Sequence, residues 1–486
     1  MNTDVRALEP QVMWNHFADL NAVPRGSKKE EKVIRFMVDF GKNLGLETIV
    51  DEVQNVIIKK PATKGMEDRK TVVLQSHLDM VHQKNNDTVF DFDTEGIRMY
   101  IDGDWVTADG TTLGADNGLG VAAIMSILES TDIPHPPLEA LFTIDEETGM
   151  TGAQGLQGGY LDGDILLNLD TEDDDEIDIG CAGGIDITAK GSYIQKDILQ
   201  DTVLLKLTVT GLNGGHSGMD IHRGLGNANK IMNRLLYESF DFEIGLAELH
   251  GGSLRNAIPR ESVAVLAVPE AKKQIFEEQI NESAAIIKRE FKVMDPGLKI
   301  TLEPCKKAFE DVMDTHNFIT FIKTIYAAHN GVFRMSPDME DLVETSNNIA
   351  KVTVENGQIL IECLTRSSVE STKMDLAHAL RSTFELAGYE VTFSGSYPGW
   401  QPNPESPILN VMTGLYEKMF DDKPQVVACH AGLECGILGT NYPDMDMISF
   451  GPTIKGAHSP DERANIPSVQ KFWNYLLEIL ANIPKK

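Results

Sequence analysis

Cysteine is scarce in this chain, and no two cysteines have the spacing of a zinc-binding or redox motif. The 486 residues contain only five of them, Cys181, Cys305, Cys363, Cys429 and Cys435. Such a small, odd and scattered set argues against a disulfide framework and against a thiolate zinc site. We therefore expect a protein of a reducing compartment, the cytoplasm.

Long apolar runs and an excess of basic residues are also missing. No run reaches the roughly 18 apolar residues that span a membrane, and the first ten residues are too polar and acidic for a secretory signal. The chain carries 74 Asp and Glu against 43 Lys and Arg, a net charge of −31. Nucleic acid and anionic membrane surfaces are therefore not expected as partners.

Several common catalytic signatures are absent as well. The sequence has no HExxH helix, GxSxG elbow, Walker A loop or GxGxxG fingerprint, which argues against the enzyme classes built on them. Its composition, 42% hydrophobic and 24% charged, is that of an ordinary globular protein. The chain has more residues than a single hydrophobic core usually organises, so two or three domains are expected.

Apolar strands alternate with helices in the first 183 residues. After a helical opening at 11–48, apolar strands are predicted at 55–58, 71–75, 140–144 and 164–168, with a helix at 119–128. Such strands indicate an α/β sheet covered on both faces. The same alternation of helices and apolar strands returns after Trp400, with a helix at 406–420, a strand at 447–450 and a helix at 469–480. We predict one discontinuous domain from residues 1–183 and 400–486.

Residues 184–399 follow a different pattern. Strand, helix, two strands, helix and strand are predicted in turn at 202–210, 227–237, 247–254, 261–268, 270–292 and 298–302. A second passage, at 317–394, repeats this order but lacks a clear first strand. We predict an inserted α+β domain of two ferredoxin-like halves.

An acidic triplet follows the apolar strand at 140–144. It contains Glu146 and Glu147 side by side. Adjacent carboxylates at a buried strand end are unfavourable unless a cation or a proton holds them together. His77 and Asp79 end another strand, where residues two apart face the same side. Taken alone, that pair could be structural.

Three further candidates lie at predicted loops. Asp116 precedes a helix, Asp170 follows a strand, and His458 lies in a loop rich in glycine and proline. Singly they could be a helix cap, a terminal carboxylate and a surface histidine. With His77 and Glu147 they offer imidazole and oxygen ligands for two cations, the composition of a two-metal hydrolase.

Five motifs in this order resemble those of a known family: SHLD at 76–79, GADN at 114–117, DEE at 145–147, NLD at 168–170 and GAHS at 456–459. The family is that of the dizinc metallopeptidases, which include carnosinases, aminoacylases and glutamate carboxypeptidases. Residues 109–118, 168–173 and 430–435 are most similar to bacterial aminoacyl-histidine dipeptidases. The resemblance covers essentially the full length. It implies a mixed-sheet zinc-peptidase domain with an inserted lid.

The resemblance implies a ligand set for two Zn²⁺ ions per chain. His77 and Asp170 would bind one zinc, Glu147 and His458 the other, and Asp116 would bridge them. Co²⁺ or Mn²⁺ would tolerate similar ligands.

The resemblance also implies roles beside the metal ligands. Glu146 would be the general base, Asp79 would orient His77, and the peptide bond between Asp116 and Asn117 would be cis. In the lid, His216 would stabilise the oxyanion. Substrate contacts would come from Asn256, Arg366 and the backbone of Gly432, and a share for Arg255 is left open.

The implied activity is hydrolysis of small, unblocked dipeptides, broad in specificity and including Xaa-His substrates, by a metal-activated water. The alternative enzyme is an N-acyl amino acid deacylase or carboxypeptidase with the same metal core. A non-catalytic metal-bound peptide receptor and a metal-free scaffold are the other classes considered. A duplicated lid would let His216 act within one chain, so a monomer would be competent, with homodimerisation through another surface left open.

Overall fold

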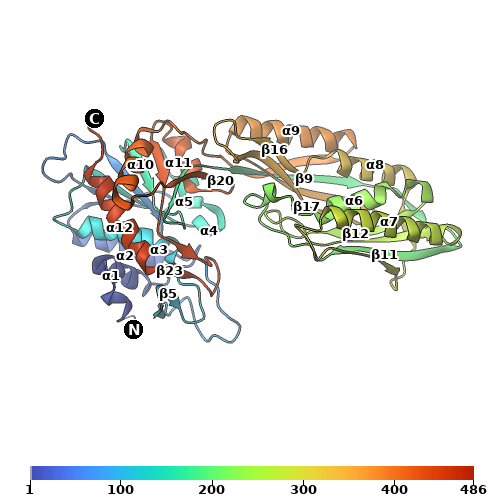
Figure 1. Ribbon diagram of the computed structural model, residues 1–486, viewed down its shortest axis with the longest axis horizontal. Coiled ribbons are helices and arrows are strands. Elements are labelled where there is room, and N and C mark those ends of the chain that lie inside the picture. The colour runs from blue at the N-terminus through green and yellow to red at the C-terminus, as the bar shows by residue number, and fades with distance from the viewer. Residues whose placement is uncertain (1–2) are drawn as a thin grey trace. The chain divides into compact units, whose positions relative to one another are not determined.

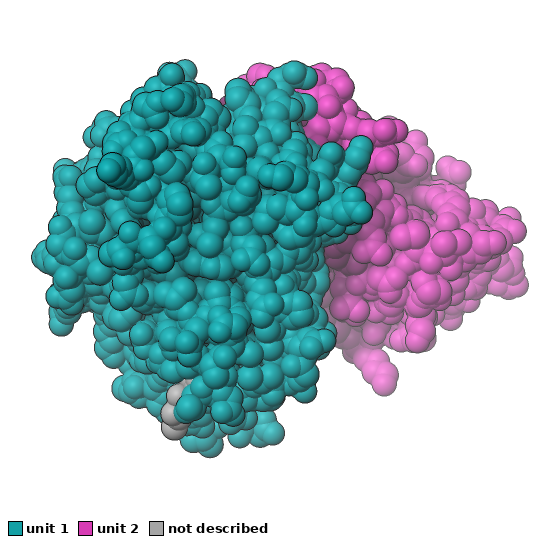
Figure 2. All heavy atoms as spheres, turned by 60° about the vertical axis from the view of Figure 1, so that its left-hand side comes forward, with its two compact units in different colours: residues 1–180, 402–428, 433–486 teal, residues 181–401, 429–432 magenta. Residues whose placement is uncertain are grey.

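A computed structural model describes residues 3–486 and divides the chain into two compact units (Figure 2). Unit 1 comprises residues 1–180, 402–428 and 433–486, and unit 2 comprises 181–401 and 429–432. The short segment 429–432, predicted within the first domain, thus belongs to the second. The amide of Ala182 donates to the carbonyls of Cys429 and Ala431, at 3.0 and 2.9 Å.

Unit 1, which carries the labels α1 and α12 in Figure 1, is built on a mixed sheet whose central strands are buried. From edge to edge the strands are β1 (Glu47–Val50), β2 (Val56–Lys60), β6 (Leu138–Thr143), β3 (Val72–His77), β7 (Ile165–Asn168), β21 (Asp446–Ser449), β8 (Glu176–Cys181) and β20 (Gln425–Cys429). Strands β6, β3, β7 and β21 run parallel. Every residue of β3, β6 and β7 is buried, which confirms the prediction of a sheet covered on both faces.

The helices of unit 1 are α1 (Gln11–Leu20), α2 (Glu31–Asn43), α3 (Ala115–Glu129), α4 (Glu146–Gly149), α5 (Thr151–Gly155), α10 (Pro407–Phe420), α11 (Glu434–Asn441) and α12 (Ile466–Ala481). Helix α3 is almost wholly buried, packing on β3 and on α1. Sequence patterns missed the short strands of a four-stranded sheet, β22 (Ile454–Lys455), β23 (Arg463–Asn465), β5 (Trp105–Ala108) and β4 (Met99–Asp102). Two to four residues are too few to show alternation.

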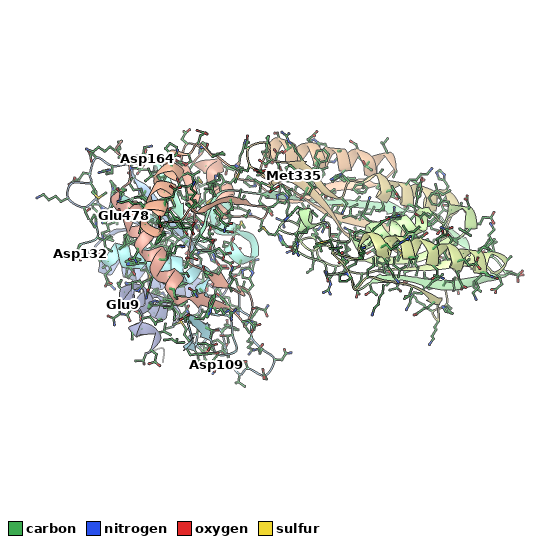
Figure 3. The ribbon with its side chains drawn as sticks, viewed as in Figure 1. Glu9, Asp109, Asp132, Asp164, Met335 and Glu478 are labelled. Atoms are coloured by element: carbon green, nitrogen blue, oxygen red, sulfur yellow. The ribbon has the colours of Figure 1, made fainter. Side chains whose placement is uncertain are left out.

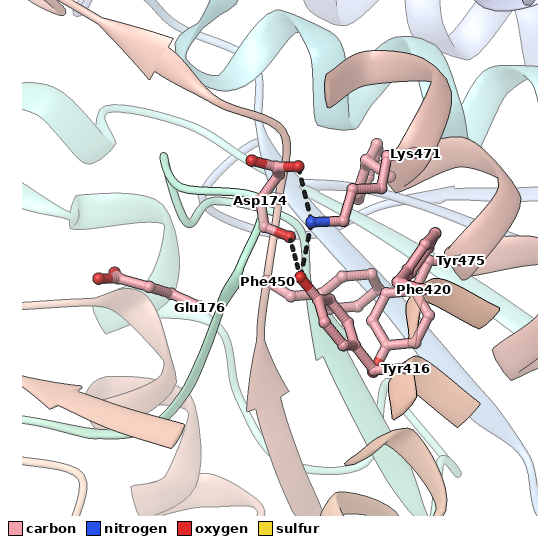
Figure 4. Close-up of a pocket in the computed structure, with 9 residues that line it drawn as sticks. Asp174, Glu176, Tyr416, Phe420, Phe450, Lys471 and Tyr475 are labelled. Carbon is pink, nitrogen blue, oxygen red and sulfur yellow. Dashed lines mark hydrogen bonds and ion pairs between the residues drawn. The ribbon is translucent and has the colours of Figure 1, made fainter. Parts of the chain in front are cut away.

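The C-terminal helices of unit 1 pack together through an aromatic cluster (Figure 4). The ring of Tyr475 contacts those of Tyr416, Phe420 and Phe450. Lys471 donates to the Tyr416 hydroxyl at 2.6 Å and pairs with Asp174 at 2.9 Å. The small cavity beside them is lined by none of the predicted site residues. The ring contacts thus join α10 and α12 to Phe450, the residue that follows β21.

Unit 2 is built on a nine-stranded antiparallel sheet with helices α6 (Ala228–Tyr237), α7 (Lys273–Glu290), α8 (Thr315–Ala327) and α9 (Glu370–Leu386) packed on one face (Figure 1). The strand order is β14 (Lys299–Pro304), β11 (Thr202–Thr210), β13 (Ser262–Pro269), β12 (Gly245–Gly251), β17 (Val343–Glu355), β18 (Gln358–Ser367), β9 (Gly183–Ser192) and β19 (Glu390–Tyr397). Strand β16 (Gly331–Met335) pairs with β17. Strands β10 (Gln195–Asp197) and β15 (Asp311–Met313) form a separate pair.

The two halves of this sheet have the same topology, and their corresponding strands are arranged in opposite order across the sheet. In the first half, β11, α6, β12, β13, α7 and β14 follow one another, as predicted. In the second half the missing first strand is β9, which pairs with β18 and β19. The halves meet where β12 pairs with β17. The predicted duplication is therefore confirmed, with the first half inserted after the opening strand of the second.

Much of the chain's negative charge is on the surface of unit 1. Glu9, Asp109 and Asp132 are exposed examples (Figure 3). Exposed carboxylates remain hydrated and need no partner, unlike the buried acids described below. Within residues 3–486, no helix combines the length and the apolar character needed to cross a membrane.

Candidate active site

The predicted ligands gather at one edge of the unit 1 sheet. His77 is the last residue of β3, Glu146 and Glu147 begin α4 just after β6, and Asp170 lies two residues beyond β7. These three strands are parallel neighbours, so their carboxyl ends share one edge. In open α/β sheets this is the edge at which ligands bind.

Asp116 lies between two histidines and offers one oxygen to each. Its Oδ1 is 3.1 Å from Nε2 of His77, and its Oδ2 is 3.1 Å from Nε2 of His458. Asp170 Oδ1 lies 3.5 Å from the same nitrogen of His77, and Glu147 Oε2 lies 2.9 Å from that of His458. A carboxylate shared in this way is suited to a pair of neighbouring metal ions.

The five residues form two overlapping groups that could each hold a metal ion. In each group the candidate donor atoms lie within 4.8 Å of one another: His77, Asp116 and Asp170 in the first, and Asp116, Glu147 and His458 in the second. Imidazole nitrogen and carboxylate oxygen are suitable donors for zinc. The Oε1 atom of Glu147 is buried without a hydrogen-bond partner in the described residues. The donor set therefore fits two divalent cations.

The electrostatics of the cluster also favour bound cations. Burial lowers the pKa of His77, but Asp170, Asp116 and Asp79 outweigh it, and the pKa is raised well above 6.5. Hydrogen bonds that His458 donates to Asp116 and Glu147 raise its pKa to about 11. The excess of carboxylates thus favours positive charge in the site, which bound divalent cations would supply.

Glu146 is the acid whose pKa is most clearly raised in this cluster. Burial is the main cause, with further contributions from the charges of Asp170, Glu434 and Glu147. Burial also raises the pKa of Glu147. A carboxyl group with a raised pKa is suited to taking up and returning a proton.

Asp79 lies behind the ligands and accepts several hydrogen bonds. It is fully buried, and its Oδ1 is 3.3 Å from Nδ1 of His77. Its carboxylate also accepts from the amide of Glu146 at 3.0 Å and from the hydroxyl of Ser27 at 2.8 Å. Asp79 therefore orients the imidazole and the acidic loop together.

The backbone at the site has unusual conformations. The Asp116–Asn117 peptide bond is cis, as expected from the family resemblance. Asp145 and His458 have left-handed φ angles of 53° and 63°. Residues other than glycine adopt such angles mainly where their surroundings hold them, often at functional sites.

Sequence patterns missed a buried polar network beneath the ligands. Glu434 is fully buried and accepts from Gln75 at 2.6 Å and from Thr143 at 2.7 Å. Burial raises its pKa to about 7. Arg25 and Glu462 are also buried beside the site. The polar sequence around Arg25 and Glu462 gives no sign of their burial, because burial of single residues is not visible in a sequence.

Unit 2 holds a second polar cluster, built around Arg366. Arg366 is buried, donates to the hydroxyl of Tyr397 at 2.9 Å, and has Nη2 3.4 Å from Nε2 of His216. The Nδ1 atom of His216 accepts from the amides of Gly218 and Met219, at 3.2 and 3.0 Å. Its Nε2 therefore carries the proton in the neutral ring. Two donors facing one another suit a shared anionic acceptor.

The remaining predicted substrate contacts are in unit 2, close to this cluster or in the segment beside it. Asn256 is exposed, and its carbonyl accepts from the amide of Ser217, next to His216. Gly432 lies in the segment 429–432, in which the carbonyl of His430 packs against Gly218. Arg255 is engaged elsewhere, with Ile187, Thr188, Glu362 and Cys363.

The chain is similar to known metallopeptidases over its whole length. Residues 73–482 match the model of Peptidase family M20/M25/M40. The chain is 44% identical to the cytosol non-specific dipeptidase of Escherichia coli K12 over 485 residues, all of both chains. It is also 44% identical to the aminoacylhistidine dipeptidase of Vibrio alginolyticus, with a TM-score of 0.93 covering 99% of this chain and 98% of that one.

A more distant structure shares the fold alone. An aminopeptidase from Bacillus cereus is 15% identical, with a TM-score of 0.58 over 98% of this chain and 99% of that one. The ligand cluster on the unit 1 sheet, the inserted unit 2 and the full-length similarity lead to one assignment. The chain belongs to peptidase family M20/M25/M40.

Proposed function

We propose that this protein is a two-metal dipeptidase that hydrolyses unblocked dipeptides, including those that end in histidine. Its high identity to the two bacterial dipeptidases supports this proposal. The observation that carries it is Asp116, which presents one carboxylate oxygen to each of two histidines. We further propose zinc as the metal, since the ligands are imidazole and carboxylate, with Co²⁺ or Mn²⁺ as substitutes.

The metal ions would lie within the two ligand groups. His77 and Asp170 would hold one ion, Glu147 and His458 the other, and Asp116 would contact both. When bound, the ions would acidify a water molecule and polarise the scissile carbonyl.

The chain itself supplies proton transfer and orientation in this proposal. Glu146 takes the proton of the attacking water at its carboxylate and returns it to the leaving amine. Its burial raises its pKa, which makes it able to keep the proton between the two steps. Asp79 holds Nδ1 of His77, so that Nε2 of that ring points toward Asp116.

The cluster of unit 2 supplies the contacts to the peptide. The guanidinium of Arg366 pairs with the free carboxylate, and the Nε2–H of His216 stabilises the oxyanion that forms during hydrolysis. Asn256 and the backbone of Gly432 contact the peptide backbone. With Arg366 reading the terminal carboxylate, short substrates are favoured.

A panel of substrates tests the proposal against its alternatives. We expect the purified enzyme to hydrolyse unblocked dipeptides, Xaa-His among them, much faster than N-acetyl amino acids, and to lose activity when a chelator removes metal. Faster cleavage of N-acetyl amino acids would indicate the deacylase, and metal binding without hydrolysis would indicate a peptide receptor. The identity to the Escherichia coli enzyme supports a cytosolic location.

A further inference from the structure

We propose that Arg25 and Glu462 form a clamp that fixes the loop 113–116 and so positions Asp116 for both of its histidine neighbours. The inference rests on the proposed function, because it concerns the ligand shared by the two metal ions. It assigns a positioning role to a residue, Arg25, that precedes the matched family region at 73–482.

Glu462 forms one side of the clamp. It is almost fully buried, at 2% exposed. Its Oε2 accepts from the amides of Leu113 and Gly114, at 2.7 and 3.0 Å. Its Oε1 accepts from the amides of Ala115 and Asp116, at 2.7 and 3.3 Å. One carboxylate thus binds four consecutive N–H groups at the start of the buried helix α3, where the helix dipole favours negative charge.

Arg25 forms the other side, from the loop between α1 and α2. It is 1% exposed, and its Nη1 donates to the carbonyls of Leu78 and Asp79, at 3.1 and 3.0 Å. Its Nη2 donates to the carbonyl of Gly114 at 2.5 Å and to Asn21 at 3.1 Å. Three backbone carbonyls from two ligand-bearing segments are therefore tied to one guanidinium.

The two sides meet on a single residue, Gly114. Its amide donates to Glu462, while its carbonyl accepts from Arg25. Its φ angle is 70°, in the left-handed region that glycine adopts freely. A Cβ atom here would lie 2.4 Å from Nη2 of Arg25. The position thus requires glycine, both for its conformation and for the close approach of the arginine.

The clamp connects all three segments that meet at Asp116. Arg25 holds the chain just after His77, and Glu462 lies four residues beyond His458 in the same loop. Burial lowers the pKa of Arg25 to about 10, opposed chiefly by Glu462, so the arginine remains a cation at neutral pH. Because both histidines lie 3.1 Å from Asp116, a shift of this loop would displace a ligand of both metal ions at once.

Conservative variants test the clamp. Arg25→Lys keeps the charge but loses the planar fork, and Glu462→Gln keeps the size but replaces one acceptor oxygen with a donor. We expect each to weaken metal binding about 10- to 100-fold in competition with a chelator. We also expect an altered visible spectrum of the Co²⁺-substituted protein, and a lower kcat with KM changed less than about twofold, since the substrate contacts are intact.

Two variants elsewhere in unit 1 provide matched controls. Arg69 donates to the carbonyl of Ile483 at 2.6 Å, and Asp446 accepts from Ser406 at 2.7 Å and from the amide of Ile408 at 3.1 Å. Arg69→Lys and Asp446→Asn therefore disturb hydrogen bonds of the same kinds, though fewer of them, at positions that are not ligands. They should change thermal stability without changing metal affinity or the Co²⁺ spectrum.

The clamp and the proposed function can each be overturned by a different result. Metal affinity and a Co²⁺ spectrum equal to wild type in the folded Arg25→Lys and Glu462→Gln proteins would overturn the clamp, as would effects no larger than those of the controls. If Glu462→Gln does not fold, Glu462→Asp, which retains the charge on a shorter side chain, must show the same weakened binding. Failure of the wild-type protein to cleave dipeptides would overturn the proposed function, while the metal-affinity results would still decide on the clamp.

Discussion

The ionisable clusters of the two units are opposite in character. In unit 1, carboxylates surround His77 and His458 and raise the pKa of both rings. In unit 2, burial and the charge of Arg366 lower the pKa of His216 to about 4 and that of His430 to about 3. The same side chain is thus surrounded by negative charge in one cluster and lies beside a positive charge in the other, and its pKa shifts in opposite directions.

This difference indicates what each cluster can bind. Buried charges of one sign are unfavourable unless an ion of the other sign joins them. The carboxylates of unit 1 are suited to cations. The guanidinium of Arg366 in unit 2, which contacts the Tyr397 hydroxyl and the His216 imidazole, is suited to a carboxylate. A dipeptide hydrolysed by metal ions needs both kinds of site.

The largest effect should come from Glu146, the acid proposed to move the proton. Glu146→Gln is nearly isosteric but cannot act as a base, so we expect kcat to fall about 100- to 10,000-fold. Metal content should stay at the wild-type value, because Glu146 is outside the proposed ligand set. Glu129→Gln, at the end of α3, is the control and should retain full activity. Comparable hydrolysis by Glu146→Gln would remove the assigned base.

A smaller effect should follow from replacing Arg366, the arginine of the polar cluster in unit 2. Arg366→Lys loses the bidentate fork, and we expect KM for free dipeptides to rise about 10- to 100-fold. Dipeptide amides, which lack the carboxylate, should be cleaved equally by both proteins. Arg255→Lys, in the same unit but bonded to backbone carbonyls and Glu362, should leave KM unchanged. An equal rise in KM for both variants would contradict a carboxylate site at Arg366.

The smallest effect concerns the pH dependence of stability. His430 is buried with its Nε2 2.8 Å from the hydroxyl of Ser346, and its pKa is lowered to about 3, mainly by burial. Above pH 6.5 the residue is neutral in both the folded and the unfolded chain, so its contribution is constant. As the pH falls further, the unfolded chain takes up a proton that the folded chain does not, and stability decreases.

Replacing His430 should therefore make stability less sensitive to acid. In urea unfolding at pH 7 and pH 5, the loss of unfolding free energy between the two should be about 2 kcal/mol smaller for His430→Gln than for the wild type. An equal loss in both proteins would show that His430 is not held neutral.

The sequence predicts the fold best where patterns are long. Many strands and helices of both units follow apolar periodicity. His77 ends a buried strand, and Glu147 and Asp170 follow shortly after two others. Strand β9 was not assigned to the second half of unit 2, because its partners β18 and β19 follow more than 160 residues later. Short strands such as β22 and β23 show no periodicity, and sequence does not reveal which distant segments will pair.

The sequence predicts the side chains that would contact metal ions and substrate, but not the buried residues that hold them in place. Motifs identified the side chains that would contact metal ions and substrate, because those residue types have recognisable chemistry. Arg25, Glu462 and Glu434 were missed, since their roles depend on burial and on hydrogen bonds to the backbone. A buried arginine and an exposed one look the same in a sequence.

The central claim is that Asp116 lies between two metal ions. Anomalous X-ray diffraction from crystals of the zinc-loaded protein tests it most directly. We predict two peaks per chain, one beside His77 and Asp170 and one beside Glu147 and His458, with an oxygen of Asp116 bound to each. A single peak, or peaks only at another group such as Glu248, His250 and Glu355, would contradict the account.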